Sequence, residues 1–160
     1  MSLTPRRPLN PMSLAEALRI TAKRLASGDR YRWTHMGACN CGHLAQTVTL
    51  TPPAEIHRIA LERAGDWAEQ TREYCPTSGY PLDHVISALL DLGATLSELR
   101  DLERLTDPKV LKRISMLRRR KIDHRSREDV ILYMETWAGL LEEQNTVMSS
   151  VVKMKETLAL

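Results

Sequence analysis

Helical periodicity is the feature of this sequence that most limits its fold. Apolar side chains recur at three- and four-residue spacings along most of the chain, which is typical of amphipathic helices. No segment shows sustained alternation of apolar and polar residues with hairpin turns; only residues 47–50 resemble a short strand, and they have no obvious partner. The sequence therefore predicts an all-α fold, a compact bundle of about five or six helices with a Cys/His-bearing loop segment.

Local signals give the expected limits of these helices. A first helix begins at Ser13, a favoured N-cap residue, and ends at Gly28, which suits a left-handed helix end. A second helix is expected over 51–75, with Pro52 in its first turn. The remaining predicted helices cover 83–92, 95–105, 107–114 and 126–144.

The chain length favours one domain, because 160 residues can form a single core but are few for two. We expect residues 1–12, which are rich in Pro and Arg, to be flexible, and residues 13–145 to form a single helical domain. Residues 146–160 form a weakly amphipathic tail that could dock on the core or on a second copy of the chain, as in a homodimer.

The composition of the chain indicates which cellular compartment the protein occupies. Apolar residues make up 42% of the chain and no run of 18 apolar residues occurs, so we expect a globular protein without a membrane-spanning helix. Arg6 and Arg7 are not followed by an apolar run, which argues against an export signal and for the cytoplasm. Three cysteines are too few for a disulfide framework, and in a reducing compartment a clustered pair favours metal binding or catalysis.

The most unusual segment is the His/Cys segment, residues 33–46, with the sequence W-T-H-M-G-A-C-N-C-G-H-L-A-Q. His35, Cys39, Cys41 and His43 place four potential ligands within nine residues. Imidazole and thiolate are ligands that zinc, iron and copper prefer over magnesium or calcium. A glycine on each side of Cys-Asn-Cys would let the backbone wrap closely around an ion. The segment therefore predicts a site for a zinc or iron ion.

Cys75 is a further candidate ligand, because it ends the apolar stripe of the helix expected over 51–75. With Cys39, Cys41 and one histidine it would complete a closed tetrahedral site, which is typical of structural zinc. A three-ligand site would leave a position open for water or substrate, as in catalysis. Two alternatives are a reactive thiol pair without metal, in which His35 could activate Cys39, and thiols that are simply small buried side chains.

The basic stretch 117–127 is the densest charge cluster of the chain. It could contact phosphates, or it could be a solvated loop whose charge Glu128 and Asp129 partly neutralise; nucleic acid is therefore the less favoured partner. Residues 89–105, L-L-D-L-G-A-T-L-S-E-L-R-D-L-E-R-L, resemble the helix–Gly–helix segment of MerR-type transcription regulators. This resemblance implies local packing of two helices around a glycine and no function for the chain.

Two classes of function follow from these features. The first is a small helical protein that binds zinc or iron, with metal-dependent or redox catalysis left open. The second is a non-enzymatic regulatory or interaction module, in which the metal or thiols are structural or sensory. In that case the basic stretch or the C-terminal tail would meet a nucleic acid or protein partner.

Overall fold

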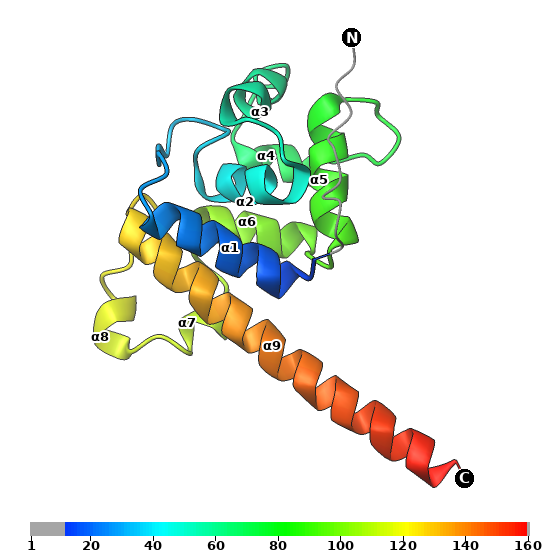
Figure 1. Cartoon of the computed structure of the whole chain (residues 1–160). Coiled ribbons are helices and arrows are strands. Elements are labelled where there is room, and N and C mark those ends of the chain that lie inside the picture. The colour runs from blue at the N-terminus through cyan, green and yellow to red at the C-terminus, as the bar shows by residue number, and fades with distance from the viewer. Residues whose placement is uncertain (1–11, 160) are drawn as a thin grey trace.

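The computed structural model describes residues 12–159, and within them every regular element is a helix (Figure 1). The helices are α1 (Leu14–Ala26), α2 (Asn40–Thr49), α3 (Pro53–Ala60), α4 (Trp67–Arg72), α5 (Pro81–Asp91), α6 (Leu96–Arg104), α7 (Pro108–Leu111), α8 (Met116–Arg119) and α9 (Arg127–Leu158). The all-α prediction is confirmed. The expected count of five or six helices is too low, because the described residues form nine.

The difference has two sources: one expected helix is broken in two, and α2 and α8 form outside the six expected helices. The helix expected over 51–75 is split into α3, which ends at Ala60, and α4; the turn that joins them contains Gly65, which adopts a positive φ of 104°. Asp66 then caps α4 by accepting a hydrogen bond from the backbone N–H of Glu69 at 3.0 Å. Residues 47–50 are not a strand: they finish α2, which ends at Leu50 with a left-handed φ of 54°.

Several predicted helix starts are confirmed. Ser13 accepts a hydrogen bond from the Glu16 N–H at the start of α1, and Thr95 forms a capping box with Glu98 at the start of α6. Asp107 caps α7. The helix expected from residue 83 begins two residues earlier as α5, whose first position is occupied by Pro81.

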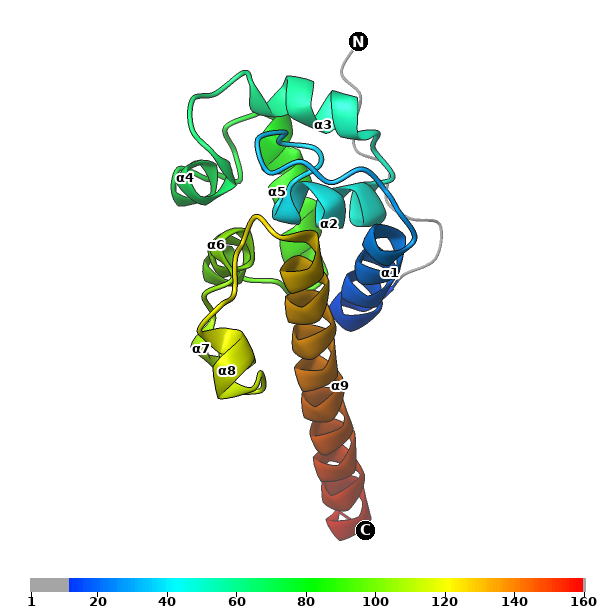
Figure 2. The same ribbon diagram turned by 90° about the vertical axis from the view of Figure 1, so that its left-hand side faces the viewer.

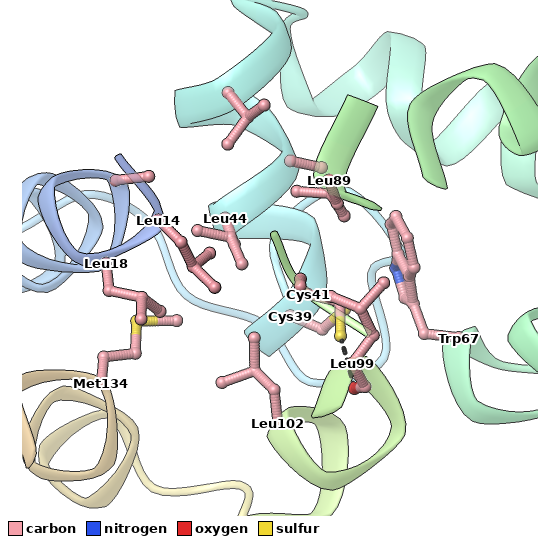
Figure 3. Packing of buried hydrophobic residues seen from close by; sticks show 14 of the residues in the cluster. Leu14, Leu18, Cys39, Cys41, Leu44, Trp67, Leu89, Leu99, Leu102 and Met134 are labelled. Carbon is pink, nitrogen blue, oxygen red and sulfur yellow. Dashed lines mark hydrogen bonds between the residues drawn. The ribbon is translucent and has the colours of Figure 1, made fainter. Parts of the chain in front are cut away.

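The body of the molecule is arranged around α2 (Figure 2), which contacts α1, α3, α5 and α6. α1 packs along the first half of α9, and α4 packs on α6. The core between these helices is made mainly of aliphatic side chains, among them Leu18, Leu44, Leu99 and Met134, with Trp67 at one side (Figure 3). This packing buries α2 on nearly all sides, so that nine of its ten residues are buried.

The last helix is much longer than its sequence pattern predicts. The helix expected to end at residue 144 continues without a break to Leu158. Its first half packs on the body through Val130, Met134 and Trp137, whereas its second half projects away from every other helix (Figure 1). None of the helices in the described range is both long and apolar enough to cross a membrane. Apart from Met12, the segment predicted to be flexible lies outside the described residues.

Candidate functional site

The two paired thiols lie at the buried start of α2. Cys39 and Cys41 are 1% and 0% exposed. The Cys41 thiol donates a hydrogen bond to the Leu99 carbonyl at 3.2 Å (Figure 3), and the Cys39 thiol lies 3.8 Å from Oε2 of Glu103. Burial, reinforced by the nearby Glu103 carboxyl, raises the pKa of both thiols well above its ordinary value. Both are therefore neutral at pH 7, which disfavours a role as thiolate nucleophiles.

Glu103 is a part of this cluster that the sequence reasoning missed. Its side chain comes from the end of α6, is only 2% exposed, and accepts a hydrogen bond from the Cys41 backbone N–H at 3.1 Å. It thereby satisfies a free N–H group in the first turn of α2, where the N-cap residue provides no side-chain acceptor. The sequence does contain a signal that Glu103 points inward: it follows the apolar Leu99 by four residues and therefore lies on the same face of its helix.

Asn40, the residue between the two cysteines, connects α2 to two distant segments. Its amide nitrogen lies 3.1 Å from each of three backbone carbonyls, those of Leu102, Glu103 and His124. Its amide oxygen accepts a hydrogen bond from the Tyr31 hydroxyl at 2.6 Å. The amide has two N–H donors for these three carbonyls, so both its hydrogens and its oxygen are engaged although the side chain is fully buried.

His43 has both ring nitrogens engaged. Nε2 donates to the Arg30 carbonyl at 2.8 Å, and Nδ1 accepts from the Arg24 guanidinium at 3.2 Å. Arg24 also donates to Thr47 and Gln46, at 2.6 and 2.7 Å. Burial lowers the pKa of His43, the Arg30 carbonyl partly offsets this, and the Arg24 charge lowers it further. The imidazole is therefore neutral and acts as a bridge between α1, α2 and the loop that joins them.

His35 stacks on His57 of α3, with ring centroids 4.1 Å apart and the planes inclined by 20°. The backbone N–H groups of Gly37 and Met36 donate to Nδ1 of His35 and of His57, at 3.1 and 3.0 Å. These bonds place the proton of each neutral ring on Nε2. Burial, with smaller contributions from His57 and then Arg32, lowers the pKa of His35. The pair attaches the loop before α2 to α3.

The two glycines of the His/Cys segment permit close approach of backbones. A Cβ atom at Gly37 would lie 1.9 Å from the Pro53 carbonyl oxygen, and one at Gly42 would lie 2.4 Å from the Met36 carbonyl oxygen. The Trp67 indole N–H donates to the same Met36 carbonyl at 2.8 Å. The glycines are thus explained by packing of the loop on α2 and α3.

The predicted ligands face different partners. Cys39 and Cys41 lie beside Glu103, and His43 faces arginine and a carbonyl. His35 stacks on another histidine, while Cys75 is exposed in the loop after α4, where its thiol lies 3.4 Å from the Thr77 hydroxyl. Across residues 12–159, no group of three or more His, Cys, Asp and Glu side chains has an arrangement that could hold a metal ion. Binding of zinc or iron at these residues stays a prediction.

Comparison with known proteins gives no match: no family model, no curated protein and no solved structure matches the chain. The fold and the site define a class all the same. The chain is an all-helical protein whose His/Cys segment forms a buried polar centre that joins α1, α2, α3, α6 and the loop before α9.

Proposed function

We propose that this chain is a non-enzymatic interaction module that pairs with a second copy of itself through the projecting end of α9. One observation carries the proposal, a row of exposed apolar side chains on that end of the helix. The row consists of Val147, Met148, Val151, Val152, Met154 and Leu158, with exposed fractions from 38% to 82%.

The spacing of these residues suits helix pairing. Val147, Val151, Met154 and Leu158 follow one another at intervals of four, three and four residues, which is the a/d pattern of a coiled coil. Ser149 lies on the outer face of the helix. A second copy supplies an identical stripe, and burying one such side chain contributes roughly 1.5–3 kcal/mol when burial is complete.

Geometry also favours self-pairing. Because the body lies at the other end of α9 (Figure 2), antiparallel pairing of these ends would place the two bodies at opposite ends of the paired helices. A short helix that lacks tertiary contacts is marginally stable in water, and pairing would stabilise the projecting turns. The charged side chains on this part of the helix, Lys153, Lys155 and Glu156, are exposed and lie outside the stripe, which is itself uncharged.

The state of the His/Cys segment supports a non-enzymatic module. Its thiols are buried and neutral, and His43 has no free ring nitrogen. Zinc or iron at the predicted ligands, and a cytoplasmic location, stay predictions that this proposal does not require. The free thiols of Cys39, Cys41 and Cys75 fit a reducing compartment.

The test is the mass of the full chain in solution, measured by light scattering or sedimentation over a range of concentrations. We expect twice the chain mass of 18.2 kDa at high concentration, and a monomer when Val151→Glu and Met154→Glu are combined. The matched control combines Ser149→Glu and Lys153→Glu, which places the same side chains on the outer face and should leave the dimer intact. A monomeric wild-type chain, or a dimer that survives the Val151→Glu and Met154→Glu changes, would contradict the proposal.

A further inference from the structure

Two loops that are distant in sequence meet on one surface. The loop before α2 contributes Tyr31, whose hydroxyl oxygen lies 2.9 Å from the carbonyl oxygen of His124 in the loop before α9. The Trp33 ring meets the His124 ring edge to face, with centroids 4.6 Å apart. In Figure 2 both loops reach the same end of the body, beside α2. Arginines from both loops are therefore brought together.

The charge of this surface is mainly positive. Arg30 and Arg32 are exposed, and within residues 12–159 neither forms an ion pair with a carboxylate. The Arg104 guanidinium lies 5.5 Å from the centroid of the Trp33 ring. We call the set the cationic aromatic patch; it consists of Arg30, Arg32, Trp33, Arg104, Arg125 and Arg127.

Acidic neighbours reduce this charge only in part. Arg125 lies 3.5 Å from Asp123, and Arg104 pairs with Asp66 at 2.5 Å. The arginine side chains of both pairs are about half exposed or more. Exposed ion pairs of this kind contribute little to the free energy of folding, so a phosphate can compete with the carboxylate for the guanidinium.

The histidines at this surface respond to the same positive charge. Burial is the main cause that lowers the pKa of His124, and Arg104 lowers it further. The pKa of His35 is lowered by burial, by His57 and then by Arg32 and Arg30. Protonation of these rings is therefore opposed by the arginines around them.

The basic stretch 117–127 contributes Arg125 and Arg127 to the patch, but two of its other arginines are held by partners within the protein. Arg118 pairs with Asp129, and Arg119 is partly buried and donates to the Ile114 carbonyl at 3.1 Å. Arg113, just upstream, pairs with Glu143 at 2.7 Å. The guanidinium that lies near the Trp33 ring belongs instead to Arg104 of α6, and the exposed Arg30 and Arg32 lie in the same loop as Trp33.

We propose that the cationic aromatic patch binds single-stranded nucleic acid. Guanidinium groups match phosphate oxygens in a two-pronged geometry, and an aromatic ring beside arginine offers a surface on which bases stack. The patch is built from loops rather than from a free helix, which is the element that usually enters the major groove of a duplex. An acidic peptide would use the arginines but would gain nothing from base stacking at Trp33. This proposal is independent of self-pairing through α9.

The experiment uses the full chain and a fluorescently labelled single-stranded oligo-dT, with binding followed by anisotropy at several salt concentrations. We expect Arg30→Ala combined with Arg32→Ala to weaken binding about tenfold or more. The same change should reduce the slope of log K against log salt by roughly 0.7 for each phosphate that the protein no longer neutralises. Trp33→Leu should weaken binding about tenfold with an unchanged salt slope, because stacking does not release counterions.

The matched control, Lys153→Ala combined with Lys155→Ala, removes the same charge from the far end of α9 and should leave the affinity within twofold. Far-UV circular dichroism and solution mass check that each variant folds and assembles as the wild type does. The proposal is overturned if oligo-dT does not bind at low salt, or if the control weakens binding as much as the Arg30 and Arg32 changes. Binding only to acidic peptide or to anionic vesicles would overturn it as well.

Discussion

The most direct test of the packing around the His/Cys segment is one chemical change made at two helical glycines. Replacing glycine by alanine inside a helix normally stabilises it by up to about 1 kcal/mol. At Gly139 of α9 the new Cβ would have 3.8 Å to its nearest neighbour, the Arg19 guanidinium, so this gain should appear. At Gly42 of α2 the new Cβ would lie 2.4 Å from the Met36 carbonyl oxygen and 2.6 Å from the Gly37 carbonyl carbon, both of them backbone atoms.

Backbone atoms cannot move aside as a flexible side chain can, so Gly42→Ala forces α2 and the preceding loop apart. Overpacking of this kind costs about 1–3 kcal/mol, which exceeds the gain in helix propensity. We expect Gly42→Ala to be destabilised by roughly 1–2 kcal/mol and the two variants to differ by about 2–3 kcal/mol. For a chain of this size that difference corresponds to about 4–12 °C in Tm.

The assay is thermal and urea unfolding followed by far-UV circular dichroism, with wild type, Gly42→Ala and Gly139→Ala measured side by side. If Gly42→Ala melts at or above the wild-type temperature, the loop does not pack on α2 as described. In that case the structural explanation of the Cys-Asn-Cys-Gly sequence is wrong.

Thiol reactivity, pH dependence and metal content offer further tests. Cys75 should react at once with an aromatic disulfide reagent, whereas Cys39 and Cys41 should react only on unfolding because they are buried; two or more fast thiols in the native protein would contradict this. The pKa of His35, His43 and His124 is lowered in the folded state, so the folded chain binds fewer protons, and the free energy of unfolding should fall as pH drops from about 6.5 towards the lower folded values. Burial raises the pKa of Glu103, which acts in the opposite direction, but Glu103 is one group against three histidines. Urea midpoints that do not fall between pH 7.5 and pH 5.5 would refute the lowered pKa of these histidines. If the metal prediction holds, elemental analysis of the untagged protein should give close to one zinc or iron per chain, absent from Cys39→Ser, and metal-free protein would count against it.

Much of the helical framework is predictable because helix starts depend on neighbouring residues. Ser13, Thr95 and Asp107 cap helices in the structure as their local sequences indicate. The break between α3 and α4 is harder to predict, because a single glycine such as Gly65 is tolerated in many helices and α3 already ends at Ala60, where the sequence has no glycine or proline. The extension of α9 is missed for another reason: the apolar stripe beyond Gln144 does not face the core, so the core-facing pattern ends there although no stop signal follows.

The centre of the structure is only partly readable from the sequence. The spacing of His35, Cys39, Cys41 and His43 picks out the segment, but it does not say what each side chain meets. The partners are set by tertiary packing, since Glu103 lies 62 residues after Cys41. Soft ligands close together in sequence can therefore face separate partners once the helices are packed.

The hydrogen bonds of Asn40 also set an order for folding during synthesis. Its carbonyl partners follow it by 62, 63 and 84 residues, so most of the chain must be made before this amide can bond to its native partners. Until then the Asn40 amide is hydrogen-bonded to water, and the nascent α2 has no neighbours from α6 or the loop before α9. We expect these long-range contacts to close late and the early helices to stay loosely packed until residue 124 has emerged. A chain truncated before that residue would expose the apolar faces of α1 and α2, which makes it a natural substrate for chaperones.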